Sequence, residues 1–460
     1  MLKSIRNIFA IPDLRKRVIF TLLLLAVYRL GAQIPIPGIN AEALFEFFKS
    51  AAGGFLGFVD LFAGRALSRM SIFALGIWPY ISASIILELL VVVWPYLEKL
   101  KKEGELGQKK ITQMTRYGTV VICLVQGLGM AIGLERATSP TGQPVVMDPG
   151  WGFRFITVIT FMAGTIFIMW LGEQITERGI GNGISLIIFS GIVVGLPRGI
   201  ADIVEKLRGG EMSPLKILFL LAFMLVVTGF IVFVERGQRR IPVSYAKRVQ
   251  GRKIYGGQST HLPIKVNTGG VIPIIFASSV ITFPATIAGF IKHPIAQSIS
   301  RQLSFGMPLY VLLYLAGIVF FTYFYISIIY NPQDVSENLR KYSGFIPGIR
   351  PGKNTADYID SVLSHLTFIG AIYLAVVALI PEFLMAGVKV DTIPFIGDSL
   401  DAFLPKWFTQ GMNVNFYFGG TSLLIVIGVA MDTLNQIESQ LVMRNYESFL
   451  GGRTRLRGRR

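Results

Sequence analysis

GGFLGFVDLFAGRALSRMSIFALGIWPYISASIILELLVVVW, residues 53–94, contains two apolar segments of unequal length. As a helix, the second segment (72–94) is long enough to cross a hydrocarbon core of about 30 Å, and only Pro79 and Glu88 interrupt it. The first segment (55–64) covers about half of that thickness. A half-length apolar helix enters a membrane only where protein or a cavity receives it. The pair therefore predicts a re-entrant element in a pore, with an interfacial helix or an ordinary loop as the alternative for the short segment.

The composition indicates that the whole chain belongs in a membrane. Of its 460 residues, 52% are hydrophobic and only 15% are charged, whereas a soluble domain has roughly 25% charged residues. We therefore expect an all-α membrane protein with ten transmembrane helices, of which the fifth and ninth have the shortest uninterrupted apolar stretches. The expected spans are 18–34, 72–94, 117–134, 153–171, 183–203, 215–234, 269–291, 305–330, 366–381 and 412–431.

Lys and Arg are unequally distributed between the two sides of this arrangement. If the N-terminus is cytoplasmic, the cytoplasmic segments hold 30 of the 44 Lys and Arg residues and the opposite segments hold 13. Because Lys and Arg concentrate in cytoplasmic loops, both termini are predicted to be cytoplasmic. The basic N-terminus is followed by no small-residue cleavage site, so the first span is expected to remain attached. The formal net charge of +17 also suits anionic lipid, an acidic partner or a nucleic-acid partner.

Two long cytoplasmic loops carry much of this basic charge. Residues 235–268 contain eight Lys or Arg residues interleaved with two tyrosines, and residues 331–365 contain four. Within the second loop, residues 348–352 have the Gly and Pro pattern of a tight turn that presents Arg350. One interpretation is that these charges do no more than orient the chain in the membrane. The length and Gly/Pro content of both loops favour docking surfaces for a large partner.

An internal repeat relates the second and seventh spans. GIWPYISAS at 76–84 and GVIPIIFAS at 270–278 share Gly, Pro, Ile, Ala and Ser at matching offsets. Each repeat lies in the second span of its five-span half. Because five is an odd number, the two halves would cross the membrane in opposite senses. Inverted halves with Pro-interrupted helices predict a central pathway between them. The expected divisions are 1–210 for the first half, 211–436 for the second, and 437–460 for a basic tail.

No catalytic, cofactor or metal site is apparent in the sequence. Gly352 and Lys353 lack the upstream glycine and the following Ser or Thr of a phosphate-binding loop. Cys123 is the single cysteine, which excludes a disulfide framework within the chain, and the three histidines show no metal-ligand spacing. We therefore expect a protein that is not an enzyme and has no cofactor.

The stretch IFALGIWPYISASII at 72–86 resembles the SecY family, the large subunits of Sec protein-conducting translocons. The chain looks like a bacterial member along nearly its whole length. Further stretches agree with the family in the same order: IPIPG (34–38), ERGIGNG (177–183), QSTHLP (258–263), GVIP (270–273), GFIPGIRPG (344–352) and GGTSLLI (419–425).

The resemblance implies two inverted five-helix halves around an hourglass pore, with a re-entrant plug helix over about residues 55–66. The implied pore ring consists of isoleucines: Ile77, Ile81, Ile184, Ile188, Ile275 and Ile425. The implied plug has an apolar surface: Phe55, Leu56, Phe58, Val59, Leu61 and Phe62. The implied lateral gate between the second and seventh helices contains Ser82, Ile85 and Phe283. The implied docking residues for a ribosome or motor are Arg252, Lys253 and Arg350.

The resemblance also implies the partners and the location of the chain. The partners would be the small subunits SecE and SecG, the SecA ATPase motor, the ribosome, membrane lipids, and a translocating polypeptide with its signal sequence. The chain would lie in the bacterial inner membrane. It departs from the family pattern at Glu88, in the long outer segment 382–411, and in the Arg-rich tail from Arg453.

Two other functions are compatible with parts of the sequence. Inverted halves alone also suit a secondary transporter of a small solute, and basic loops alone suit a membrane scaffold for ribosomes. Arg29 and Glu88 are the clear charges within the spans, and a coupled transporter usually needs such a buried ionisable group. Glu88 is expected near the cytoplasmic end of its span. Ile77, Ile81 and Ile85 share one helical face, which fits a pore lining or ordinary contact with lipid or core.

Overall fold

The computed structural model describes residues 11–51, 60, 63–210, 213–245, 248–250, 253–255, 259–290, 294–303, 306–386 and 420–451. The chain forms two compact units. The first unit contains Met1–Val204, Pro284–Ser300 and Ile425–Arg460, and the second contains Glu205–Phe283 and Arg301–Leu424.

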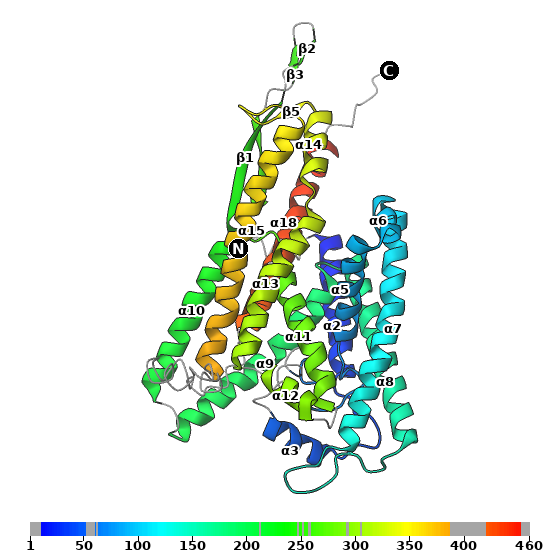
Figure 1. The fold of residues 1–460 in the computed structure, drawn as a ribbon. Coiled ribbons are helices and arrows are strands. Elements are labelled where there is room, and N and C mark those ends of the chain that lie inside the picture. Colours follow the sequence, from blue (N-terminus) through cyan, green and yellow to red (C-terminus); the bar gives the residue numbers. More distant parts are fainter. Residues whose placement is uncertain are drawn as a thin grey trace, which may run out of the picture. The chain divides into compact units, whose positions relative to one another are not determined.

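Most helices of the first unit come from the first half of the sequence (Figure 1). They are α2 (Pro12–Gly31), α3 (Ala41–Ala51), α5 (Trp78–Val93), α6 (Pro95–Lys102), α7 (Glu105–Glu135), α8 (Trp151–Arg178) and most of α9 (Gly183–Arg208), α12 (Pro294–Gln302) and α18 (Gly420–Gly451). Within this group α7 packs against both α5 and α8, and α8 also packs against α2. The α7 contacts join helices that are near one another in sequence, whereas α2 and α8 are distant in sequence.

The second unit combines helices with short strands. Its helices are α10 (Pro214–Arg236), most of α11 (Ile272–Phe290), α13 (Pro308–Ile329), α14 (Pro332–Lys341) and α15 (Lys353–Ala386). Its strands are β1 (Gln238–Tyr245), β2 (Arg248–Gln250), β3 (Lys253–Tyr255), β4 (Ser259–Lys265) and β5 (Gly344–Phe345). The helix α15 packs along both α13 and α14.

Each of the ten predicted spans overlaps a helix. The matching helices are α2, α5, α7, α8, α9, α10, α11, α13, α15 and α18. Among the described residues, six helices are long and apolar enough to cross a membrane, or up to seven if the bent pair α5–α6 is one span. The total of ten spans stays a prediction.

The predicted start of the second span, at residue 72, is wrong. The helix α5 begins at Trp78, with Pro79 near its first turn, where the missing N–H of proline has no helical partner to lose. Residues 63–77 form successive turns instead, and Gly64 and Gly76 have the positive φ angles of +64° and +55° that glycine adopts readily. This turn segment is nonetheless core, because its apolar side chains are almost fully buried: Ala63, Ala66, Leu67, Met70, Phe73 and Ala74.

The turn segment is fastened to the chain that follows α2. The Ile36 N–H donates to the Met70 carbonyl at 2.9 Å, and the Ile72 N–H donates to the Ile34 carbonyl at 3.0 Å. These bonds satisfy backbone groups that the buried turns leave without helical partners. The IPIPG stretch at 34–38 therefore has a structural role: it holds the part of the turn segment that follows the predicted plug in the sequence.

A sharp bend ends the second span. The axes of α5 and α6 differ by 98°, and Trp94 between them is extended, as the residue before a proline tends to be. The helix α6 then packs its apolar side chains, Leu97 and Leu100, with Val91 and Ile111.

The two basic loops fold together instead of forming separate loops (Figure 1). The strands β1 and β4 make an antiparallel hairpin from residues 235–268, and β5 from the second loop pairs with the other edge of β1. A shared cluster lies beneath them: Ile241, Ile264, Ile326, Ile346, Ile359 and Leu363. The second loop is also more helical than expected, since it contains α14 and the first residues of α15.

Candidate functional site

Five of the six predicted ring residues belong to the first unit. Ile77, Ile81, Ile188 and Ile425 are buried there, and Ile184 is half-buried. Ile77 caps the start of α5, and its carbonyl accepts from the Ile81 N–H at 3.1 Å, so these two positions follow one helical turn. The sixth, Ile275, is a half-buried residue of α11 in the second unit. A common axis for all six stays a prediction.

The start of α9, which carries Ile184, is fixed by polar groups of its own and of α8. The Asn182 side chain accepts from the N–H groups of Ile184 and Ser185 at 3.1 and 3.3 Å, as a helix N-cap does. The Thr176 hydroxyl accepts from the Gly183 N–H at 2.9 Å and donates to the Gly172 carbonyl at 2.9 Å. The ERGIGNG stretch at 177–183 therefore forms a tight joint between α8 and α9.

This joint depends on two glycines. A Cβ atom on Gly183 would lie 1.9 Å from the Gly172 carbonyl oxygen, and a Cβ on Gly172 would lie 3.2 Å from the Ile184 side chain. The backbones of the two helices can approach this closely only without side chains at these positions. The position of Ile184 is thus set by main-chain contact.

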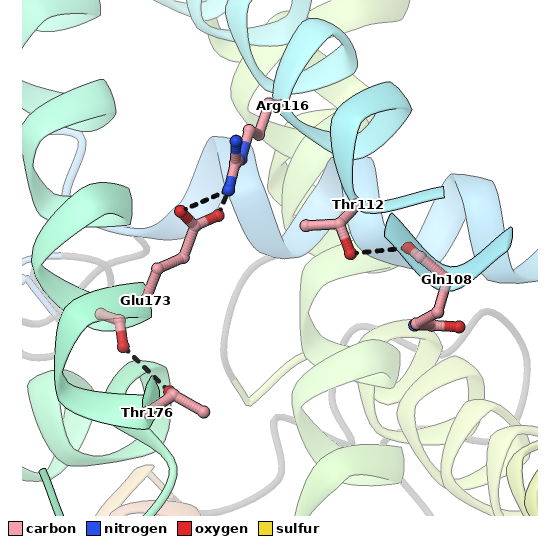
Figure 2. Close-up of polar contacts among 6 residues, drawn as sticks. Gln108, Thr112, Arg116, Glu173 and Thr176 are labelled. Atoms are coloured by element: carbon pink, nitrogen blue, oxygen red, sulfur yellow. Dashed lines mark hydrogen bonds and ion pairs between the residues drawn. The ribbon is translucent and has the colours of Figure 1, made fainter. Parts of the chain in front are cut away.

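An ion pair fastens the same end of α8 to α7. Arg116 donates from Nε and Nη2 to the two carboxylate oxygens of Glu173 at 2.9 and 2.8 Å, a bidentate geometry. Figure 2 shows this pair between the two helices, with Thr112 one turn and Gln108 two turns before Arg116 on α7, and Thr176 on α8. Glu173 follows Gly172 directly, so the pair also supports the joint with α9.

A second ion pair fastens the opposite ends of these helices with the charges exchanged. Arg154 of α8 donates to Glu135 of α7, with 2.6 Å between Nη2 and Oε2. The Gly150 N–H donates to the same carboxylate at 3.0 Å, and the Arg154 guanidinium lies 5.1 Å from the centre of the Trp151 ring. The α7–α8 hairpin is therefore held at both ends by Arg–Glu contacts.

The predicted gate residues are only partly described. Ser82 is half-buried and Ile85 is buried, both on α5. Phe283 lies within α11, and its side chain lies outside the described residues. The gate therefore stays a prediction.

The predicted plug and docking residues fall mostly outside the described part of the chain. This applies to Arg252 and to all six plug residues: Phe55, Leu56, Phe58, Val59, Leu61 and Phe62. Lys253 lies in β3, with its side chain outside the described residues. Arg350 is exposed after a turn in which Gly348 has a φ of +84°, and its carbonyl accepts from the Thr355 hydroxyl at 2.9 Å.

Two charged residues within the spans have distinct surroundings. Arg29 of α2 donates hydrogen bonds to Ser190 of α9 and to the Gly64 carbonyl. Sequence reasoning noted this charge without assigning it a role. Glu88 of α5 has a carboxylate oxygen, Oε2, that is buried without a hydrogen-bond partner in the described residues. Unsatisfied buried oxygens of this kind are uncommon.

Comparison with known proteins gives consistent results. The SecY family model matches residues 71–434. The protein translocase subunit SecY of Escherichia coli K12 is 50% identical over 442 residues, covering 95% of this chain and 94% of the relative. The same subunit of Aquifex aeolicus is 44% identical over 451 residues, covering 98% of this chain and 100% of the relative.

Two solved structures have the same fold at low sequence identity. A protein-conducting channel is similar with a TM-score of 0.62 and 18% identity, covering 93% of this chain and 92% of that one. Sec61 in a canine ribosome-channel complex is similar with a TM-score of 0.59 and 16% identity, over 93% and 92% of the two chains.

Proposed function

The chain belongs to the SecY family, and from this premise we propose that it is a protein-conducting channel. It passes unfolded secretory polypeptides across the membrane and releases apolar segments sideways into lipid through a lateral gate. The observation that carries the proposal is the 50% identity to a translocase subunit over 95% of the chain. The fold shared with a protein-conducting channel supports it.

A ring of isoleucines suits a channel whose cargo has no fixed chemistry. A passing polypeptide presents every kind of side chain as well as backbone polar groups. Hydrogen-bonding groups in the constriction would retain some sequences more strongly than others, whereas branched apolar side chains make contact without chemical preference. A narrow apolar constriction also disfavours a continuous column of water and ions. The plug adds a second barrier in the resting channel.

Lipid sorting follows from transfer free energies once the gate opens. Leu, Ile, Phe and Val gain about 0.3–0.6 kcal/mol each near the centre of an inserted helix, while a central Asp, Lys or Arg costs about 2.5–3.5 kcal/mol. An apolar segment of about 20 residues therefore gains roughly 6–12 kcal/mol by leaving sideways. A polar segment loses free energy by the same step and remains in the pore.

The driving force comes from partners at the basic cytoplasmic loops. We place the SecA motor or the ribosome at the sheet β4–β1–β5, with SecE and SecG as small membrane subunits. Docking there is supported by the exposed Arg350 and by the shared core beneath the strands, which gives the surface a fixed shape. Ribosome contact through Lys and Arg should weaken steeply with salt. In this arrangement the chain lies in a bacterial inner membrane with both termini cytoplasmic.

A crosslink across the gate tests the proposed function. Cysteines replace Ser82 and Phe283 in a Cys123→Ala background, which removes the chain's single native cysteine. Vesicles contain the purified chain with SecE and SecG, and receive SecA, ATP and a secretory precursor. We expect oxidation to lower translocation to the level seen without ATP, because a closed gate cannot admit the signal sequence. Reduction should restore it.

Single-cysteine variants under the same oxidant are the matched controls and should translocate normally. Undiminished translocation by the quantitatively crosslinked protein would contradict the gate.

Glu88 separates the channel from a small-solute transporter. A transporter that coupled its cycle to protonation at Glu88 would lose coupling in Glu88→Gln. For a channel, we expect Glu88→Gln to keep the translocation rate within about twofold, because the amide has nearly the same volume and removes a buried charge at little cost. Precursor translocation by the variant and wild-type vesicles decides between them. A loss greater than about tenfold would give this carboxylate an essential role.

A further inference from the structure

Arg29 joins three segments of the first unit at one point. Its guanidinium donates from Nε to the Ser190 hydroxyl at 3.2 Å, from Nη1 to the Gly64 carbonyl at 3.3 Å, and from Nη2 to the Ser190 carbonyl. These bonds link α2, α9 and the turn segment 63–77. A charged group within a membrane helix is tolerated where such oxygens surround it, and usually has a function.

The contact at Gly64 is close enough to require glycine. Its φ is +64°, and a Cβ there would lie 2.7 Å from Arg29 Nη1 and 2.9 Å from the Gly191 Cα. The backbone at this point therefore rests directly on α9. One residue earlier, the Ala63 carbonyl accepts from the Tyr28 hydroxyl at 3.4 Å. Adjacent residues of α2 thus hold adjacent carbonyls of the turn segment.

Asp60, the described residue nearest before the turn segment, is bonded to that segment. The Asp60 carbonyl accepts from the Arg65 N–H at 2.7 Å, and its buried carboxylate accepts from the Ser68 N–H at 2.7 Å. The position where the predicted plug ends is therefore a compact turn. On α9, Ser190 follows the predicted ring residue Ile188 by two positions.

We propose that Arg29 is a positioning residue that latches the C-terminal end of the plug segment to α9 and so stabilises the resting, closed channel. The proposal rests on the proposed function and adds the residue that retains the plug. Arg29 bonds to neutral oxygens among the described residues. Such contacts break without separating an ion pair, so the plug end can leave α9 when a polypeptide enters and return afterwards.

The test separates ion leakage from translocation in the same vesicles. Vesicles contain the complete complex with SecE and SecG, and resting ion flux is measured before SecA, ATP and precursor are added. We expect Arg29→Met to raise the resting flux about 10-fold, because loss of a hydrogen bond to a charged group shifts a two-state equilibrium by about that factor. Translocation should be retained, since the pore itself is unchanged.

A second variant perturbs the contact without changing the charge. Gly64→Ala introduces the Cβ that meets Arg29 and Gly191, and we expect it to raise the flux as Arg29→Met does. Arg17→Met is the matched control, because Arg17 is exposed on the same helix, and should leave the flux unchanged. Arg29→Lys should be intermediate, since lysine retains the charge but not the planar fork.

Three results would overturn the latch. One is unchanged resting flux in both Arg29→Met and Gly64→Ala, with translocation normal. Another is a parallel loss of translocation and folded protein in both variants, which indicates a purely structural role. A third is an equal flux increase in Arg17→Met. Wild-type vesicles that fail to translocate precursor would instead contradict the proposed function.

Discussion

Replacing Gly164 by alanine should sharply lower the stability of the folded protein. Gly164 lies on α8, and a Cβ there would be 1.9 Å from the Ile72 carbonyl oxygen and 3.3 Å from the Phe73 side chain. The obstructing atom is backbone within the buried turn segment, so it cannot move aside as a flexible side chain would. Overpacking a close-packed interior costs about 1–3 kcal/mol, and we expect the upper end of that range. The measurement is the apparent melting temperature of the purified protein in detergent.

The matched control is Gly152→Ala on the same helix, where a Cβ would meet nothing within 4 Å. Alanine also has a higher helix propensity than glycine. The control should therefore melt at or slightly above the wild-type temperature. Equal behaviour of the two variants would show that α8 does not press on the turn segment as described.

Reversing the charge of Arg154 should separate the C-terminal end of α7 from the N-terminal end of α8. Arg154→Glu places two carboxylates together where Glu135 now accepts from Nε and Nη2 of the arginine. The Glu135 side chain is only 8% exposed, so water provides little compensation. The double variant Glu135→Arg with Arg154→Glu should recover most of the loss, because the pair is re-formed with unchanged loop charge. We expect the folded-to-unfolded ratio of the double variant to exceed the value obtained by adding the two single effects by about 10-fold or more.

An exposed pair supplies the control for charge reversal. Lys102 and Glu98 are 2.6 Å apart on α6, with side chains 74% and 53% exposed. Because exposed pairs contribute little to stability, Lys102→Glu should change the melting temperature only slightly. Additive effects of the Glu135 and Arg154 changes would contradict a direct ion pair.

Sequence reasoning located the helices well because hydrophobic length is a strong signal in a membrane protein. It failed at residues 72–77, where buried turns are as apolar as a helix and carry no periodic pattern to separate the two. The only signals in the sequence for the start of α5 at Trp78 are Gly76 and Pro79.

The strands were missed although a signal was present. Ile241 and Val243 in β1 are two residues apart, as are Leu262 and Ile264 in β4, which is the spacing of one face of a strand. A proline lies between the members of each pair, and this weakens the strand signal. The eight Lys and Arg residues of the same loop favour a docking interpretation, which says nothing about its secondary structure. The pairing of β1 with β5 joins residues about a hundred positions apart, and local pattern does not reveal such a partner.

The candidate site was predictable to different degrees. The ring residues came from family resemblance, because an isoleucine in an apolar span has no chemical signature of its own. Arg29 and Glu88 were visible as charges within spans, but the contacts of Arg29 come from segments distant in sequence. The ERGIGNG stretch at 177–183 was noted only as a family motif. Its role as a joint depends on main-chain approach between Gly172 and Gly183.

The doubly fastened α7–α8 hairpin has a consequence for the choice of membrane. Arg116 and Glu135 are 19 residues apart on α7, and Arg154 and Glu173 are 19 apart on α8. At about 1.5 Å per residue, both separations are about 28 Å, close to the hydrocarbon thickness of about 30 Å. In bilayers of longer acyl chains, the hairpin would have to tilt less or thin the bilayer locally. Otherwise one ion pair would lie in the hydrocarbon region, below the headgroups. Stability should therefore pass through a maximum as acyl-chain length is varied.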